Sequence, residues 1–190
     1  MEILLILASV CMVLFMILAT YDGFYLHIFK YGLFNHEEST FEHKTHTVRA
    51  ILFPAIVWLL FVNETSFGLF LLGVGLVLLD LVVLAIDAYS ETESRKFMGG
   101  LPKWEYIIHL FSNSLHFAAI MLVLAMKIDL VNGGLVFVST IPASFAKEVF
   151  VFVSVNLIPG SILLALVHFI LLVERPRVVW NTYRSKISCC

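Results

Sequence analysis

Residues 66–88 of the chain read SFGLFLLGVGLVLLDLVVLAIDA, and this run decides the fold class. Its only charged side chains are Asp80 and Asp87. A helix needs about 20 consecutive apolar residues to cross the hydrocarbon core of a bilayer, where its backbone N–H and C=O groups must bond to each other. The run is therefore expected to form a transmembrane helix.

Four more apolar runs lie on either side of it. The 190-residue chain is 61% hydrophobic and only 14% charged, against roughly 25% charged in an ordinary soluble domain. We predict a single all-α domain over residues 1–190, an integral membrane helical bundle with five transmembrane helices. Residues 128–146 are interrupted by Asn132-Gly133-Gly134 and Pro142, so we expect a re-entrant or interfacial loop there. The predicted spans are 3–21, 45–63, 66–88, 104–126 and 148–173, with residues 22–44 connecting the first two.

The basic residues predict the orientation. Of the 12 Lys and Arg residues, only Lys127 and Lys147 do not fall in the connection 22–49, the connection 89–103 or the tail after residue 173. Basic residues beside membrane spans mark the cytoplasmic side. The N-terminus is therefore expected outside and the C-terminus in the cytoplasm, in a bacterial inner membrane or a eukaryotic endomembrane. Lipidation of the terminal Cys189 and Cys190 is chemically feasible, but the sequence does not single it out.

Composition narrows the partners. The formal net charge is −2, so the chain lacks the basic excess that nucleic-acid binding requires. Three cysteines cannot form a disulfide framework of the secreted kind. The expected partners are the bilayer, a hydrophobic or lipid-like small molecule and a second copy of the chain.

Ionisable residues are concentrated on particular faces of the predicted spans. In the fourth span, Glu105, His109, Ser112 and His116 are spaced i, i+4, i+7 and i+11, which places them on one helix face. In the third span, the two aspartates seven residues apart likewise share a face. Charged groups inside a membrane are costly, so they indicate a functional site.

All seven histidines fall in the predicted cytoplasmic half. Imidazole and carboxylate together bind transition metals, and a buried cation offsets the carboxylate charge. Sets of this kind on facing helices build di-metal sites in helical bundles. We therefore predict a metal centre with Fe or Zn. The candidate ligands are Asp80, Asp87, His109 and His116, followed by His43, His46 and Glu42, and then by Glu105 and His36.

Each candidate also has a structural interpretation. Glu42 follows Ser39 at the spacing of a capping box, and His43 and His46 fit a solvated helix start. His27 fits an interfacial position and is expected to be structural. The two aspartates fit interhelical hydrogen bonds without any metal; their partners would be Ser112, Asn113 or His116.

The predicted function is that of a membrane-embedded metalloprotein, an oxidoreductase-type enzyme with a mono- or di-metal site acting on a lipid-like substrate. Its plan is similar to that of the fatty-acid desaturases and hydroxylases. The sequence departs from their His-x-x-His-His box, because His43-Lys44-Thr45-His46 is followed by Thr47. The alternatives are a proton or metal-ion transporter, a b-type haem protein that transfers electrons, and a structural subunit of a membrane complex.

Overall fold

The computed structural model describes residues 1–188 and contains five helices long and apolar enough to cross a membrane. The prediction of five span-length helices is therefore confirmed. The helices are longer than the predicted spans, because the first continues past Tyr21 and the second begins before residue 45. Their full extents are Glu2–Tyr31, Glu37–Val62, Phe67–Met98, Lys103–Lys127 and Phe145–Leu171.

Several of these helices combine more than one helical geometry. The α-helical α1 continues as the π-helical η1, and α2 continues as the π-helical η4 after Pro54, which has no N–H to donate. Short 3₁₀ turns precede α2 and follow α3. The elements are α1 (Glu2–Ala19), η1 (Thr20–Tyr31), η2 (Leu33–Asn35), η3 (Glu37–Ser39), α2 (Thr40–Ile56), η4 (Val57–Val62), α3 (Phe67–Ser94), η5 (Lys96–Met98), α4 (Lys103–Lys127), β1 (Ile128–Val131), β2 (Gly134–Phe137), α5 (Phe145–Leu171) and α6 (Glu174–Ser188).

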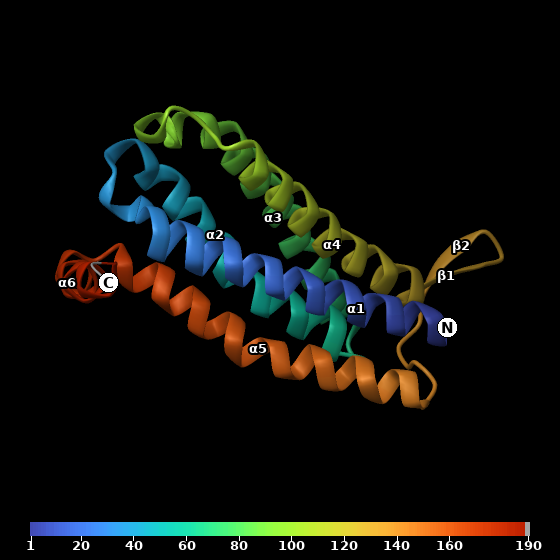
Figure 1. Ribbon diagram of the computed structural model, residues 1–190. Coiled ribbons are helices and arrows are strands. Elements are labelled where there is room, and N and C mark those ends of the chain that lie inside the picture. The colour runs from blue at the N-terminus through green and yellow to red at the C-terminus, as the bar shows by residue number, and fades with distance from the viewer. Residues whose placement is uncertain (189–190) are drawn as a thin grey trace.

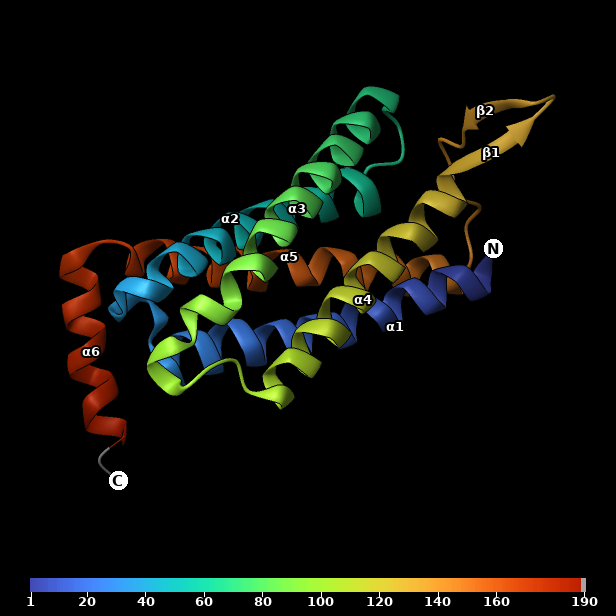
Figure 2. The same cartoon turned by 90° about the horizontal axis from the view of Figure 1, so that it is seen from above.

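The bundle has two distinct ends (Figure 1). The N-terminus and the β1–β2 hairpin lie at one, the hairpin end, and α6 lies at the other, the α6 end. Helix α1 packs on α4 and α5, and α2 packs on α3 and α5. Helices α3 and α4 diverge from the turn that joins them instead of packing along their lengths (Figure 2).

The segment expected to form a re-entrant or interfacial loop contains a β-hairpin, so the fold is not purely helical. Strands β1 and β2 pair antiparallel with Val131 opposite Gly134, which leaves a two-residue turn. Both turn residues, Asn132 (φ 51°) and Gly133 (φ 80°), have positive φ, as a type I′ hairpin turn requires. The Asn-Gly pair that interrupts the apolar run is thus the turn of a hairpin.

Buried apolar and buried polar side chains occupy different halves of the interior. A core of buried apolar residues from α1, α2, η4, α3, α4 and α5 fills the hairpin half of the bundle. At one point α3 comes very close to η4, because a Cβ at Gly73 would lie 2.6 Å from Leu60 Cδ2. The buried carboxylates and most buried histidines lie in the half nearer α6. The fold therefore surrounds a polar cluster with helices at one end and seals the other end with apolar packing.

Candidate metal centre

Four helical segments each direct two ionisable side chains, about one turn apart, into the interior near the α6 end. One segment contributes two carboxylates, and each of the others contributes a carboxylate and a histidine. Seven of the eight residues are buried, and only His46 is partly exposed. This acid–histidine cluster consists of Asp22 and His27 from η1, Glu42 and His46 from α2, Asp87 and Glu91 from α3, and Glu105 and His109 from α4.

The π-helix η1 brings Asp22 and His27 onto one face. In an α-helix, residues five apart point about 140° away from each other, because each residue turns the helix by about 100°. A π-helix bonds residue i to residue i+5, so the two side chains come into register. Their contact, 3.3 Å between His27 Nε2 and Asp22 Oδ1, follows from this geometry.

His27 lies between the acids of three segments. Besides Asp22 Oδ1, its Nε2 is 3.7 Å from Glu105 Oε1 and 3.9 Å from Glu42 Oε1. The Nε2 atom also accepts a hydrogen bond from Arg95, so a metal ion bound there would replace the guanidinium as the partner of this lone pair.

His109 and His46 connect the remaining acids. His109 lies 3.0 Å from Asp22 Oδ1 through Nε2 and 3.0 Å from Glu91 Oε1 through Nδ1. His46 Nε2 lies 3.2 Å from Asp87 Oδ2, and the other oxygen, Asp87 Oδ1, accepts a hydrogen bond from Thr45.

Two sets of side chains in this cluster have the spacing of a metal site. In each set, one potential ligand atom per residue lies within 4.8 Å of all the others. Ligand atoms sit about 2.0–2.2 Å from a zinc ion, and hence up to about 4.4 Å apart, so the contacts of 3.0–3.9 Å fit one ion. The sets are Asp22, His27, Glu105 and His109, and His27, Glu42 and His46.

Arg95 is the cation already present in the cluster. It caps the C-terminus of α3, is fully buried, and bonds Glu42 Oε2 at 2.6 Å and Glu105 Oε1 at 2.6 Å. This arrangement leaves Glu42 Oε1, Glu105 Oε2 and His27 Nδ1 without a hydrogen-bond partner among residues 1–188. The arginine therefore satisfies only part of the bonding capacity of these residues.

The buried charges do not balance. Within the described chain, the buried carboxylates are those of Asp22, Glu42, Asp80, Asp87, Glu91 and Glu105. Among the described residues, the guanidinium groups that form ion pairs with them are those of Arg95 and the partly buried Arg49. Four negative charges are left for histidine protons or bound cations to offset, because buried unpaired charges are costly.

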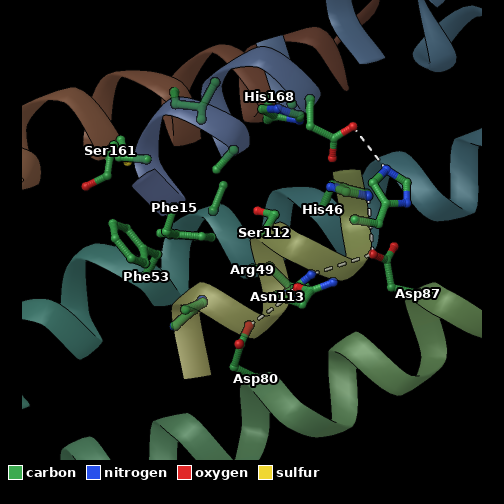
Figure 3. A pocket seen from close by; sticks show the side chains of 18 of the residues that line it. Phe15, His46, Arg49, Phe53, Asp80, Asp87, Ser112, Asn113, Ser161 and His168 are labelled. Atoms are coloured by element: carbon green, nitrogen blue, oxygen red, sulfur yellow. Dashed lines mark hydrogen bonds and ion pairs between the residues drawn. The ribbon is translucent and has the colours of Figure 1, made fainter. Parts of the chain in front are cut away.

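A cavity of about 90 Å³ extends from the cluster toward the middle of the bundle (Figure 3). Arg49 spans it, because Nε donates to Asp80 Oδ1 at 3.1 Å and Nη2 donates to Asn113 Oδ1 at 2.9 Å. Phe15 and Phe53 line it on the apolar side. The volume is enough for several water molecules.

The structure separates the predicted ligands into groups. Glu42, His46, Glu105 and His109 fall within the two metal-spaced sets, and Asp87 contacts His46. The capping-box interpretation of Glu42 is wrong, because the α2 N-cap Ser39 bonds Ser94 O and the Glu42 carboxylate bonds Arg95.

The other predicted ligands lie outside both sets. Asp80 and His116 line the cavity nearer the middle of the bundle. His43 Nε2 bonds the backbone oxygen of His168 at 3.1 Å. His36 stacks on Phe97 with 3.8 Å between ring centroids. The terminal cysteines lie outside the described residues.

Sequence reasoning missed four residues of the centre. It placed Asp22 in the connection between the first two spans and interpreted His27 as structural. It selected neither Glu91 nor Arg95, which both fall in the predicted connection 89–103. The i, i+5 spacing of Asp22 and His27 would have placed them on one face only if a π-helix had been expected there. A comparison with known protein families, curated proteins and solved structures gives no match for the chain.

Proposed function

We propose that this chain is an integral membrane metalloprotein whose acid–histidine cluster binds one or two transition-metal ions, with Fe and Zn favoured. The observation that carries the proposal is the excess of four buried carboxylates over guanidinium groups, in contact with three histidines. Divalent cations would offset this excess, and imidazole selects transition metals over Mg²⁺ and Ca²⁺. Because both metal-spaced sets include His27, we expect the first ion beside that residue.

We further propose that the centre lies on the cytoplasmic side and performs oxidoreductase-type chemistry on a lipid-soluble substrate. The basic residues beside the spans support this orientation, because the cluster shares the α6 end with most of them. A bound metal would supply Lewis-acid or redox chemistry there. The chain's own residues would hold the ion and exclude bulk water, and they line a cavity that extends from the ion toward the middle of the bundle.

Two observations argue against the transporter and haem alternatives. Beyond His116, the buried face of α4 is apolar up to Lys127, so no polar path crosses the bundle along this helix as a transporter requires. The haem alternative would pair His116 or His109 with His168 or His46, all of which line the cavity. Its volume of about 90 Å³ is far below the roughly 300–1,000 Å³ of a pocket that encloses even a drug-sized ligand, so a porphyrin does not fit between these rings.

The experiment is metal analysis of purified protein after expression with Fe and Zn. We expect stoichiometric metal in the parent protein, loss of most of it in His27→Ala and His109→Ala, and a large reduction in Glu105→Gln, which preserves side-chain shape. Asp80→Asn and His36→Ala are matched controls, because both residues lie outside the metal-spaced sets. X-ray absorption at the metal edge should show nitrogen and oxygen neighbours only.

Two results would overturn the proposal. The first is the absence of stoichiometric metal in a folded parent protein after reconstitution with each ion. The second is equal metal loss in the control and cluster variants, which would locate the ion elsewhere. Circular dichroism of each variant separates metal loss from unfolding.

A further inference from the structure

A second polar site lies at the inner end of the cavity, around His116. This residue is near the middle of α4 and is 3% exposed, and neither ring nitrogen has a hydrogen-bond partner within the described chain. Its ring packs against Phe15 at 4.6 Å and Phe53 at 5.5 Å between centroids. A buried imidazole with both nitrogens unsatisfied, lining a cavity, points to a ligand that bonds it.

Asp80 adds a second unsatisfied atom to the same cavity. Its Oδ1 accepts from Arg49 Nε, whereas Oδ2 has no hydrogen-bond partner in residues 1–188. Asp80 is also near the middle of its helix and is 1% exposed. The cavity therefore combines an acceptor on α3 with an imidazole on α4 that can donate through one nitrogen and accept through the other.

This site is separate from the metal centre. His116 follows His109 by seven residues, which is about 10 Å along α4. Neither His116 nor Asp80 belongs to a metal-spaced set. The surroundings also differ, because His116 packs against Phe15 and Phe53, which give this part of the cavity an apolar lining.

We infer that this site binds the hydroxyl group of a lipid-soluble alcohol, which is the substrate class of the metal centre if the proposed function holds. A hydroxyl both donates and accepts, so it can donate to the carboxylate or the imidazole and accept from the imidazole N–H. A ketone or ester carbonyl only accepts and would leave Asp80 Oδ2 unsatisfied. The aromatic rings would pack on the carbons next to the hydroxyl.

The dimensions of the cavity indicate how such a molecule would lie. About 90 Å³ is small beside the roughly 300–1,000 Å³ of pockets that enclose a whole drug-sized ligand. The cavity therefore takes the hydroxyl end, and the chain extends outward. Helices α3 and α4 both line the cavity and diverge without packing along their lengths (Figure 2), so the inference places the carbon chain between them.

The test is photo-crosslinking of 1-hexadecanol carrying a diazirine near its hydroxyl end to purified protein in detergent, with adducts mapped by mass spectrometry. We expect adducts on α1 and α4 peptides, displaced by unlabelled 1-hexadecanol at concentrations about five- to tenfold lower than by hexadecane or 2-hexadecanone. His116→Phe and Asp80→Asn should remove this preference for the alcohol. His36→Phe, a histidine replacement outside the cavity, should preserve it.

Equal displacement by the alcohol and the hydrocarbon would overturn the inference and leave water as the partner of His116. Displacement by the ketone as effective as by the alcohol would overturn the assignment of a hydroxyl. Retention of the preference in both cavity variants would place the binding site elsewhere. Metal content, measured on the same samples, separates the two proposals. A protein that contains metal but shows no preference for the alcohol contradicts this inference alone. A protein that prefers the alcohol but contains no metal contradicts only the proposed function.

Discussion

Arg95 Nη1 lies 2.6 Å from Glu42 Oε2, and neither side chain is exposed to solvent. The same guanidinium bonds Glu105 through Nε and Nη2. Because Arg95 caps α3, Glu42 belongs to α2 and Glu105 belongs to α4, one side chain joins three helices. It fixes the positions of two carboxylates of the proposed metal centre.

Arg95→Ala should lower the free energy of unfolding by about 3–5 kcal/mol, because it leaves two buried carboxylates without their cation. Denaturant unfolding in detergent micelles measures the change. Lys96→Ala is the matched control, because Lys96 pairs with Glu93 on the surface with 62% of its side chain exposed and should contribute little. Similar losses in both variants would contradict the central role of Arg95.

The contact between α3 and η4 depends on the absence of a side chain at residue 73. A Cβ on Gly73 would lie 2.6 Å from Leu60 Cδ2 and 3.0 Å from Leu59 Cβ, whereas a Cβ on Gly75 would meet nothing within 4 Å. Gly73→Ala should therefore destabilise the protein by about 1–3 kcal/mol through overpacking. Gly75→Ala should leave stability unchanged or slightly raised, because alanine favours helix. Thermal unfolding of the two variants compares them directly, and equal melting temperatures would refute the tight contact.

Orientation can be tested at the two ends of the bundle. In a background with Cys11, Cys189 and Cys190 replaced by serine, single cysteines are introduced at Leu135 in the hairpin and at Ser185 in α6, both of which are exposed. A membrane-impermeant maleimide applied to intact cells should label Leu135→Cys and spare Ser185→Cys until the cells are permeabilised. The reverse pattern would invert the proposed topology and place the acid–histidine cluster on the outer side.

Much of this architecture could be predicted from periodicity. Apolar runs of bilayer length indicated five helices, since lipid leaves the backbone no other partner. The spacing of Glu105 and His109 placed both on one face of α4, and they do meet in the cluster. The spacing of polar residues therefore predicts a shared helix face wherever the helix keeps the regular α-helical period.

The remaining features depend on geometry that periodicity does not encode. Asp22 and His27 share a face only because η1 is π-helical, and an α-helical reading separates them. Arg95 follows a span and looked like a loop cation, yet the turn after α3 directs it inward. Which carboxylate an arginine binds is decided by tertiary packing, so Glu42 could be assigned to a capping box until the structure showed its partner.

Arg49 and Asp80 form an ion pair across the cavity, which joins the middle of α2 to the middle of α3. A lone aspartate at the centre of a membrane helix costs about 2.5–3.5 kcal/mol on insertion scales, so the arginine should offset much of that cost. Arg49→Met should therefore destabilise the parent protein much more than it destabilises Asp80→Asn, in which the charge is already absent. A double-mutant cycle of unfolding free energies in detergent should give a coupling of about 1–3 kcal/mol. Asn113→Ala is the matched control, because Asn113 accepts from Arg49 without a charge and should couple more weakly. Additive effects of the arginine and aspartate changes would show that the pair contributes nothing to holding α2 against α3.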